Sequence, residues 1–562
     1  MQKIIECVPN FSEGRDLEIV RQITAAIESV EGISLLNVDP GASTNRTVVT
    51  FAGSPEVAVE AAFRGIEKAA ELIDMRKHKG AHPRMGATDV CPFIPISNVS
   101  WEEAVACAND LAQRVGEQLK IPVYLYEKAA KDPSRSNLSV IRAGEYEGFF
   151  EKIRDKDWKP DFGPLIMNER AGATVIGARE FLIAYNVNLN TKAVRRANSV
   201  AFDVRENGRV KTVDGTPSGK PVLDDRGEPV RVPGMLKHVK AIGWYVEEYG
   251  IAQVSMNLTN IEETPLHVAF DACNEAAGRR GLRVTGSELV GMLPKKCLVE
   301  AGRYFLRKQN WSEGGSEGEL IDIAVRSMGL NELKPFDPNE RIIEFKMESA
   351  VTKKSLVKMD LRQFCNETLS DSPAPGGGSV AALMGALAAS LGGMVANLSA
   401  GKRGWENTIS FFSDWAVKAQ QLKDELLFLV DEDTTAFKKV MDAFALPKES
   451  AAEKETRSAA IQLANKYAAE IPLRVMETAS KSYRLLAEMA EKGNPASISD
   501  VGVGLLALRA CIDGAGMNVR TNLPGLKDEK LKSGLLKRVR EISAESESEF
   551  TRIHQIIESK LG

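Results

Sequence analysis

The stretch GGGSVAALMGALAASLGGMVANLSAG, residues 376–401, decides how the second half of the chain folds. It carries no charged side chain over a length that could cross a bilayer, so a membrane helix has to be weighed against a buried one. Its side chains are mostly Ala, Gly and Ser, which favour insertion only weakly, and no second stretch of this kind is evident. We therefore predict a close-packed helix in a soluble bundle, where small side chains let neighbouring backbones approach.

The sequence changes character on either side of this helix. Beyond it, helical periodicity and good helix formers continue to the C-terminus, which is typical of an all-α bundle. Before it, the segment 337–358 is charged and weakly periodic, and we expect a linker there. The predicted helical bundle domain therefore covers 359–562.

The first 336 residues alternate strand-like and helix-like runs. The β-branched runs GISLLNV (32–38) and RTVVTFAG (46–53) flank a turn and predict a hairpin. Pro55, directly after the potential N-cap Ser54, predicts the start of a helix. Runs of both kinds in this order indicate α+β units in which helices pack on sheets.

The alternating pattern restarts near Arg179. We therefore expect two α+β sandwich subdomains, at 1–178 and 179–336, in front of the helical bundle. The second contains a polar stretch, 208–234, that is rich in Gly, Pro and Asp and is predicted to be an exposed insertion between strands.

Composition excludes several classes of protein. A chain of 562 residues that is 43% hydrophobic and 27% charged reads as an ordinary globular protein of several domains. A net charge of -4 argues against a nucleic-acid binder, whose phosphate contacts need a basic surface. Seven scattered cysteines and an N-terminus without the apolar core of a signal peptide are expected of a cytoplasmic protein.

The stretch RKHKGAHPRMGATDVCPF, residues 76–93, contains two of the five histidines, His78 and His82. Gly80 and Pro83 argue against a helix that would place both imidazoles on one face, and no further metal ligands of suitable spacing follow, so a metal site is disfavoured. A loop histidine among cations suits an anionic substrate and a proton-carrying imidazole. A solvated basic loop remains the alternative. The cations beside the histidines are Arg76, Lys77, Lys79 and Arg84.

A carboxylate interrupts an apolar stripe in QLKDELLFLVDEDTTAFKKVMDAF, residues 421–444. Asp433 lies on this stripe, whereas Asp431 lies off it on a helix. A carboxyl group on an apolar face should have a raised pKa, and one that stays neutral can donate a proton. A structural Asp paired with Lys or Arg remains the alternative. The apolar stripe consists of Leu422, Leu426, Leu429, Phe437, Val440 and Phe444.

Two further turns in the second half have the composition of ligand-binding turns. In SDSPAPGGGSVAAL (370–383), three glycines and a serine leave free backbone N–H groups at a helix start, which suits an anion or a polar ring edge. A helix cap explains this turn equally well. In KGNPASISDVGVG (492–504), Asn494 and Asp500 either separate two helices or line a pocket.

Longer motifs resemble a known family. IIECVPNFSEGRD (4–16), NVDPGASTNRTVVTFAG (37–53), HKGAHPRMGATDVCPFIP (78–95), DFGP (161–164), GAREFLIA (177–184) and IGWYVEE (242–248) are similar to glutamate formimidoyltransferase. APGGGSVAA (374–382), DEDTTAF (431–437) and GNPASISDVGVG (493–504) are similar to the formimidoyltetrahydrofolate cyclodeaminase module. In this order they resemble the bifunctional formimidoyltransferase-cyclodeaminase family.

The resemblance implies two folate reactions late in histidine degradation. The α+β half would move a formimidoyl group from N-formimidoyl-L-glutamate to N5 of tetrahydrofolate. The helical half would close 5-formimidoyltetrahydrofolate to 5,10-methenyltetrahydrofolate and release ammonia. We therefore expect tetrahydrofolate as co-substrate, with a polyglutamylated tail, and no metal. We further expect small-molecule substrates, no nucleic acid, no membrane and a homo-oligomer.

The resemblance also implies residue roles. The catalytic histidine of the transferase falls on His82, and the proton donor of the cyclodeaminase falls on Asp433. Asp39 is expected to orient His82, with a turn-forming Asp before Pro40 as the alternative. The expected substrate-binding residues are Arg76, Lys77, Lys79, Arg84, Gly163, Pro164, Gly172, Gly376, Gly377, Gly378, Ser379, Asn494 and Asp500.

Two stretches depart from the family pattern. Folate contacts are expected within 163–172, where LIMNERA (165–171) differs from the usual form, and the insertion at 208–234 has no assigned role. We expect the transferase site where the two α+β subdomains face each other. Two rival functions for the helical half are a methenyltetrahydrofolate cyclohydrolase and a non-catalytic oligomerisation module.

Overall fold

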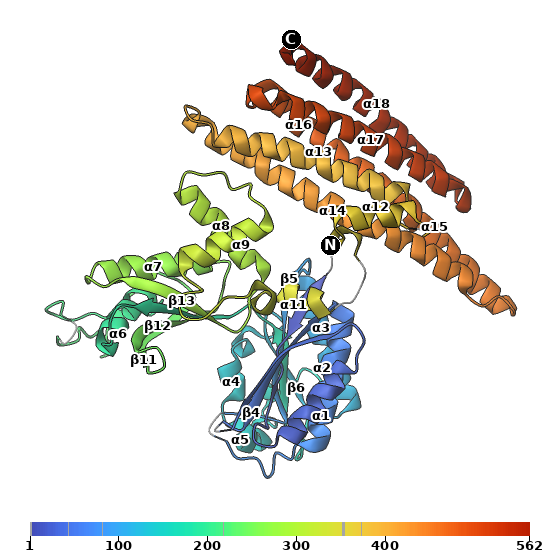
Figure 1. The fold of residues 1–562 in the computed structure, drawn as a ribbon. Helices are drawn as coiled ribbons and strands as arrows, with labels where there is room; N and C mark the ends of the chain where they lie inside the picture. Colours follow the sequence, from blue (N-terminus) through green and yellow to red (C-terminus); the bar gives the residue numbers. More distant parts are fainter. Residues whose placement is uncertain are drawn as a thin grey trace. The chain divides into compact units, whose positions relative to one another are not determined.

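A computed structural model describes residues 3–42, 44–80, 83–216, 219–350, 355–372 and 374–561. The chain divides into two compact units. The first consists of 1–298 with 328–351, and the second of 299–327 with 352–562. All described strands lie in the first unit, and the second is built of helices (Figure 1). The fold class, two α+β subdomains followed by a helical bundle, is thereby confirmed.

A mixed seven-stranded sheet forms the first subdomain. Its strands pair in the order β1-β4-β2-β5-β7-β6, and β3 pairs with the outer side of β4. The predicted hairpin is β3 and β4, which pair antiparallel, whereas β5, β7 and β6 run parallel. The strands are β1 (Ile4–Cys7), β2 (Asn10–Phe11), β3 (Ser34–Gly41), β4 (Arg46–Gly53), β5 (Thr88–Ser97), β6 (Val123–Glu127) and β7 (Thr174–Ala178).

Helices α1, α2 and α3 lie side by side along this sheet (Figure 1). α2 begins at Pro55 with Ser54 as its N-cap, as the sequence predicts. A capping box between Ser100 and Glu103 begins α3. The helices of this subdomain are α1 (Leu17–Glu28), α2 (Pro55–Leu72), α3 (Trp101–Gln118), α4 (Leu138–Arg142) and α5 (Glu145–Lys152).

The second sheet has four antiparallel strands in the order β11-β12-β8-β13, and α6 packs on β11 and β12. Its elements are β8 (Ile183–Leu189), α6 (Val194–Val204), β11 (Val239–Val246), β12 (Ile251–Leu258), α7 (Leu266–Gly278) and β13 (Val284–Val290). Helices α8 (Lys295–Lys308) and α9 (Glu317–Met328) follow in the chain, and their residues 299–327 belong to the second unit. The predicted insertion is largely exposed where it is described, and it contains the short paired strands β9 (Arg209–Val210) and β10 (Arg231–Val232).

The predicted linker contains two helices, α10 (Pro338–Arg341) and α11 (Ile343–Ala350). Ile342 and Ile343 are fully buried, and the Ile343 N–H donates to the Leu293 carbonyl at 3.1 Å. The described beginning of this segment is therefore packed into the first unit and does not hang free in solvent.

The bundle is organised around α13, which packs against α14, α16 and α17. Figure 1 shows these long helices together with α15 and α18. The helices are α12 (Leu361–Leu369), α13 (Gly377–Ala400), α14 (Ile409–Ala445), α15 (Ala451–Ser480), α16 (Ser482–Lys492), α17 (Ile498–Asn522) and α18 (Glu529–Leu561).

Glycines in α13 allow its neighbours to approach closely. A Cβ on Gly385 would lie 2.8 Å from the Cys511 sulfur, and one on Gly392 would lie 2.7 Å from Leu485. Both distances are too short for real carbon contacts, so any side chain here would push α17 or α16 away. The predicted close-packed helix of small residues is confirmed.

The expectation that this apolar helix has no counterpart is wrong. Among the described residues, two helices are long and apolar enough to cross a membrane by length and composition, Gly377–Ala400 and Pro495–Gly525. Their most apolar parts are 61% and 44% buried in the bundle, respectively. Asp500, Arg509 and Asp513 interrupt the second helix, so no uncharged stretch marks it in the sequence.

Candidate active sites

Asp433 on α14 meets the N-terminus of α13. Its Oδ2 atom lies 3.0 Å from the hydroxyl of Ser379, and this hydroxyl lies 3.0 Å from the Val430 carbonyl oxygen. The carboxyl group fits only because residue 378 is glycine, since a Cβ there would lie 2.2 Å from Asp433 Oδ1. The structure therefore brings together Gly378, Ser379 and Asp433, all three of which were expected in one site.

Burial raises the pKa of Asp433 above the ordinary aspartate value, although the hydroxyl and backbone N–H of Ser379 act in the opposite direction. The Ser379 hydroxyl can serve both protonation states, because it has one proton and two neighbouring oxygens. It donates to an ionised Asp433, or it accepts from a protonated Asp433 while donating to the Val430 carbonyl. This arrangement can therefore keep Asp433 protonated. After Asp433 has given up its proton, the Ser379 hydroxyl can donate to the carboxylate.

The alternative for Asp433, a structural ion pair with Lys or Arg, is not what the described residues show. Within the described part of the chain, no Lys or Arg forms an ion pair with this carboxyl group, and its partner is the start of a helix. Asp431 is the more structural of the two residues. Its carboxylate accepts from the Leu356 N–H at 2.6 Å and from the Ser355 hydroxyl at 2.7 Å, and it thereby ties the end of the predicted linker to α14.

The predicted apolar stripe on α14 is buried only in part. Leu426 and Leu429 are fully buried, but Phe437 is 38% and Phe444 is 49% exposed. The apolar stripe is therefore partly exposed beyond Asp433. Periodicity identifies the apolar side of a helix, but it does not tell whether another helix of the same chain covers that side.

Asn494 lies far from Asp433 within the chain. Its N–H donates to the Ser399 hydroxyl at 2.8 Å, and Lys402 donates to its side-chain oxygen at 3.3 Å. Ser399 and Ser379 are at opposite ends of α13, so about 30 Å separates them at 1.5 Å per residue. The turn with Asn494, and Asp500 in the first turn of α17, therefore do not join the Asp433 site within one chain.

Gly376 and Gly377 begin α13 beside Asp433. Gly376 is the N-cap residue, and the side chain of Asn518 on α17 approaches Gly377, with 3.4 Å between the Asn518 amide nitrogen and the Cβ position of Gly377. Asn518 was not among the expected site residues, because nothing in its sequence surroundings links it to the glycine turn.

His82 lies outside the described residues, as does Ala81, so the catalytic role of His82 stays a prediction. The structure does place the other histidine of this loop. Nε2 of His78 lies 2.9 Å from the Asn45 carbonyl oxygen, and Arg84 donates to His78 Nδ1 at 3.3 Å. This arrangement fits a neutral imidazole with its proton on Nε2, which makes His78 part of the loop's framework.

Some of the cations near the histidines already form ion pairs with carboxylates. Arg84 forms a bidentate pair with Glu147, at 2.7 and 2.9 Å, and a further contact of 2.8 Å with Glu145. Arg76 pairs with Asp74 at 2.8 Å, and its hydrogen bonds lower the pKa of Asp74 to about 2.

Lys77 and Lys79 are less engaged. Lys77 lies 3.9 Å from the carboxylate of Asp74, and Lys79 contributes its backbone carbonyl to the Asn45 amide at 3.1 Å. Of the expected anion-binding cations, these two have the most freedom to meet a substrate.

Asp39 is exposed inside β3, opposite Val48 of β4. The turn-forming alternative does not fit, since the residue lies within the paired strand. The turn that follows β3 contacts the histidine loop, because a Cβ on Gly80 would lie 2.2 Å from the Thr44 carbonyl oxygen. Asp39 therefore lies two residues before the end of the strand that leads into this contact.

Both ends of the expected folate stretch, 163–172, are glycines with positive φ. Gly172 lies against Met85 and Gly86, and hydrogen bonds of 2.8 and 3.2 Å join residues 85–87 to 171–173. Gly163, followed by the half-buried Pro164, packs against Gly116 at the end of α3. Between them, Leu165 and Ile166 are 57% and 75% exposed. The stretch thus begins at α3 and ends beside the histidine loop.

Several supporting residues were missed from the sequence. Asp89 accepts from the Met85 N–H at 3.0 Å and pairs with Arg142 at 2.6 Å, which fixes the exit of the histidine loop. Glu145 and Glu147 lie about sixty residues after Arg84 in the sequence, and their carboxylates compensate its charge. No local pattern links such distant partners.

Family models match three consecutive parts of the chain. Residues 4–179 match the formiminotransferase domain, N-terminal subdomain, residues 184–348 match the formiminotransferase domain, and residues 360–541 match the formiminotransferase-cyclodeaminase model. The formimidoyltransferase-cyclodeaminase of Gallus gallus is 43% identical over 561 residues, which cover both proteins completely.

Single-activity proteins match each half separately. Glutamate formimidoyltransferase of Thermoplasma acidophilum is 42% identical over 313 residues, 55% of this chain and 95% of that protein. Methenyltetrahydrofolate cyclohydrolase of Methylorubrum extorquens is 35% identical over 202 residues, 36% of this chain and 97% of that protein. Full-length similarity together with all three domain models identifies the fusion, and the chain belongs to the formimidoyltransferase-cyclodeaminase family.

Proposed function

We propose that this chain is a bifunctional folate enzyme of histidine degradation. Its α+β half transfers the formimidoyl group of N-formimidoyl-L-glutamate to N5 of tetrahydrofolate, and its helical half converts the product to 5,10-methenyltetrahydrofolate and ammonia. The observation that carries this proposal is the match of 43% identity over the whole of both chains to a relative named for both activities.

The transfer step needs one group that accepts and returns a proton. Attack of N5 on the formimidoyl carbon gives a tetrahedral centre, from which glutamate leaves once its nitrogen is protonated. We assign His82 to both proton transfers, because one imidazole can take the proton of N5 and pass it to the leaving nitrogen. Asp39 is assigned to orient His82. The basic residues of the loop suit the two carboxylates of the donor.

The cyclisation step needs an acid. N10 attacks the amidine carbon of 5-formimidoyltetrahydrofolate, and the exocyclic nitrogen departs as ammonia after it receives a proton. Asp433 is assigned to supply this proton. The assignment is supported by burial, which raises its pKa, and by the Ser379 hydroxyl, which can support both of its protonation states.

A second candidate activity for the helical half is hydrolysis of methenyltetrahydrofolate. The 35% identity to a methenyltetrahydrofolate cyclohydrolase favours it, since that protein matches most of the bundle. The two activities differ in one product, because only the cyclodeaminase forms ammonia.

The deciding experiment supplies the full chain with N-formimidoyl-L-glutamate and tetrahydrofolate. Glutamate, ammonia and the absorbance of methenyltetrahydrofolate are followed together. We expect all three to appear in equal amounts. Glutamate without ammonia would leave only the transferase, and loss of added methenyltetrahydrofolate without ammonia would assign the cyclohydrolase.

Further properties are proposed with this function. The folate tail is polyglutamylated, and the chemistry needs no metal, because in each step one nitrogen attacks an electrophilic amidine carbon, another nitrogen leaves it, and side chains move the protons. The protein is cytoplasmic and binds neither nucleic acid nor a membrane. The proposed functional parts are 1–178, 179–336, the linker 337–358 and 359–562. Family models match 4–179, 184–348 and 360–541, so the second model extends into the first part of this linker.

We propose a homo-oligomer as well. Helices α13 and α17 pack against each other, and each carries exposed apolar side chains at helical spacing on one side. Covering them in a second copy would remove this surface from water. These side chains are Met384, Leu387, Met394 and Leu398 on α13 and Val503, Leu506 and Met517 on α17.

Light scattering on the full chain tests the oligomer. Leu387→Glu should lower the molar mass, because a carboxylate would be buried in the contact, whereas Leu361→Glu on α12, where Leu361 is 84% exposed, should leave it unchanged. An unaltered mass for Leu387→Glu would exclude these stripes as the contact.

A further inference from the structure

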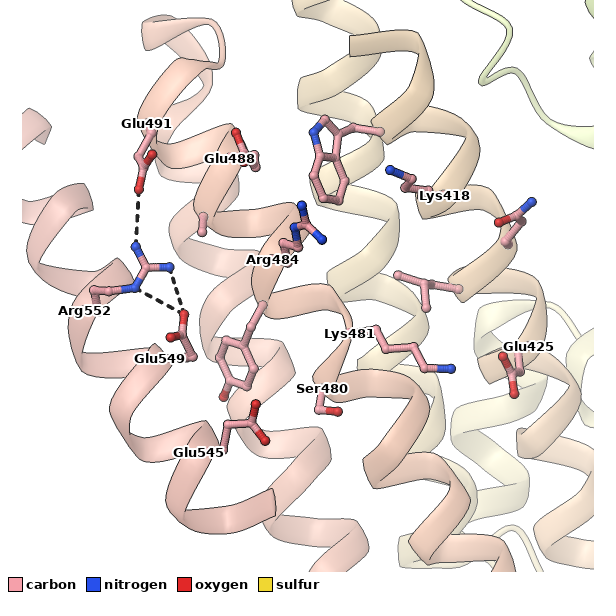
Figure 2. A pocket seen from close by; sticks show the side chains of 15 residues that line it. Lys418, Glu425, Ser480, Lys481, Arg484, Glu488, Glu491, Glu545, Glu549 and Arg552 are labelled. Carbon is pink, nitrogen blue, oxygen red and sulfur yellow. Dashed lines mark hydrogen bonds and ion pairs between the residues drawn. The ribbon is translucent and has the colours of Figure 1, made fainter. Parts of the chain in front are cut away.

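A groove of about 820 Å³ lies in the bundle, apart from Asp433. Its walls come from α14, from the junction of α15 and α16, and from α18 (Figure 2). On α14 the groove extends from Trp415 to Glu425, and Asp433 lies eight residues further, about 12 Å along the helix. No residue assigned to either reaction lines it.

Three cations in this groove have no anionic partner among the residues that the structure describes. They are Lys418 on α14, and Lys481 and Arg484 at the start of α16. Other cations near the groove are all compensated: Arg552 pairs with Glu491 and Glu549, Arg474 with Glu425, and Lys492 with Glu488. These three exposed cations are therefore available to an anionic ligand in the groove.

Two of these cations, Lys418 and Arg484, lie against one aromatic ring. Lys418 Nζ lies 4.4 Å from the centroid of the Trp415 ring, and the guanidinium carbon of Arg484 lies 5.6 Å from it. The two charges are thus within about 10 Å of each other. Figure 2 labels both side chains and shows Lys481 about one helical turn from Arg484. An anion beside the Trp415 ring would interact with both charges.

The opposite wall provides one uncompensated carboxylate. Glu545 on α18 has no ion pair among the described residues, whereas its neighbour Glu549 is held by Arg552. Figure 2 places Glu545 beside Ser480, the last residue of α15. A complementary ligand has two anionic groups for Lys418, Lys481 and Arg484 and one cationic group for Glu545. An α-amino dicarboxylate has this charge pattern, while inorganic phosphate and simple dicarboxylates lack the cation.

We propose that this groove is a second binding site for an α-amino dicarboxylate of the glutamate class. The carboxylates bind Lys418, Lys481 and Arg484, the ammonium faces Glu545, and Trp415 forms the floor. That glutamate is available at this site as a product rests on the transferase function proposed above. The charge pattern of the groove does not depend on that function.

Titration of the full chain with L-glutamate, followed by calorimetry and by tryptophan fluorescence, tests the proposal. We expect a binding event that Arg484→Gln weakens at least about tenfold, because hydrogen bonds to charged groups are lost, with Lys418→Gln acting in the same direction. Arg538→Gln is the matched control, since this arginine on α18 pairs with Glu477 outside the groove and its loss should leave binding intact. Unchanged melting temperatures show that the variants fold.

Ligand analogues define the chemistry. Glutarate, which lacks the ammonium, and L-glutamine, which lacks the second carboxylate, should both bind the groove at least about tenfold more weakly than L-glutamate. Inorganic phosphate that competes equally well would overturn the assignment to an amino dicarboxylate, as would Glu545→Gln with full affinity for L-glutamate.

A transferase assay on the same preparations separates this proposal from the proposed function. One outcome is normal transfer with a glutamate affinity that neither Arg484→Gln nor Lys418→Gln changes. This outcome overturns the groove site and leaves the transferase function intact. Absent transfer together with binding that depends on Arg484 overturns the transferase and leaves the groove site intact.

Discussion

Asp431 and Asp433 stand two residues apart on one helix, yet their surroundings give them different chemistry. The carboxylate of Asp431 accepts two hydrogen bonds that hold residues 355 and 356. The pKa of Asp433 is raised, because burial disfavours its charge more than Ser379 supports it. We therefore expect only Asp433 to act as an acid in cyclisation.

Asp433→Asn should lower ammonia release by about 10²- to 10⁴-fold, the usual range for a lost general acid, while glutamate release continues and 5-formimidoyltetrahydrofolate accumulates. The melting temperature should not fall. A raised pKa means that the folded chain holds the proton more tightly than the unfolded chain, so stability decreases as pH rises through the ordinary and then the raised pKa. At neutral pH, the Asn side chain carries no charge, so the variant does not lose stability by burying a carboxylate.

Asp431→Asn is the matched control for this experiment. It should retain ammonia release and lower the free energy of unfolding by about 1–2 kcal/mol, because two buried contacts weaken. Full-rate ammonia production by a stably folded Asp433→Asn chain, with loss in Asp431→Asn, would reverse the two roles.

Glu6 offers an independent test of burial in the first sheet. Burial raises the pKa of this β1 carboxyl to about 7, although Arg179 acts to lower it. Between the ordinary value of 4.5 and about 7, the unfolded chain loses its proton and the folded chain retains it, so stability falls across this range and then stays level.

Glu6→Gln should remove that pH dependence. Above pH 7 the variant should be more stable than the parent, by at most about 3 kcal/mol from the linkage of pKa and stability, and the two should converge near pH 4. Chemical unfolding at a series of pH values measures this. A parent chain whose first unit keeps constant stability from pH 4.5 to 8 would contradict the raised pKa.

Sequence reasoning at this scale succeeded where the signal was local. A carboxylate at an apolar helix position predicted a raised pKa for Asp433. The Gly-Gly-Gly-Ser turn, a candidate binding turn in the sequence, contains Ser379, which contacts Asp433 in the structure. It failed where the partner is distant in sequence, as with Glu147, which binds Arg84 from 63 residues away. Charge beside a histidine does not reveal whether that charge is already compensated.

At the scale of elements, the glycines of α13 determine how closely the bundle packs. Replacing a helical glycine by alanine normally stabilises a helix by about 1 kcal/mol. Gly392→Ala should instead destabilise the helical unit by about 1–2 kcal/mol, because its Cβ would meet Leu485 at 2.7 Å and overpacking outweighs the gain in propensity.

Gly534→Ala in α18 provides the comparison. Gly534 is an exposed helical glycine with no atom within 4 Å of its Cβ position, so this substitution should stabilise by about 0.5–1 kcal/mol. Denaturant unfolding of both variants yields the two values. Equal stabilisation by the two alanines would show that α13 has more room than the structure indicates.

Elements were predictable when their pattern was uninterrupted. The hairpin β3–β4, α2 and the small-residue helix α13 were found from branching, capping and composition. The second long apolar helix escaped notice, because Asp500, Arg509 and Asp513 lie within it although the helix is largely apolar. The exposed Phe437 and Phe444 escaped for a different reason, since an apolar helix face is the same in sequence whether its partner belongs to this chain or to another.

At the scale of the whole molecule, the chain joins two chemistries that the sequence places in separate folds. The residues assigned to transfer, among them Asp39 and the histidine loop 76–93, belong to the first unit, whereas Asp433 belongs to α14 in the second unit. Separate folds imply separable activities. A substitution in one half should therefore remove one reaction and leave the other.

Mixing two single-site variants tests this separation directly. His82→Ala should release no glutamate from N-formimidoyl-L-glutamate and tetrahydrofolate but should cyclise supplied 5-formimidoyltetrahydrofolate, whereas Asp433→Asn should release glutamate and stop at that intermediate. Together they should form ammonia, because the intermediate made by Asp433→Asn can be used by the intact bundle of His82→Ala. The measurements are glutamate, ammonia and methenyltetrahydrofolate for each variant and for the mixture, with melting curves to confirm folding.

A mixture that releases glutamate but no ammonia, while His82→Ala alone cyclises the supplied intermediate, would mean that the intermediate does not leave the chain in which it forms. A His82→Ala chain that still transfers at the parental rate would remove the imidazole from the mechanism altogether.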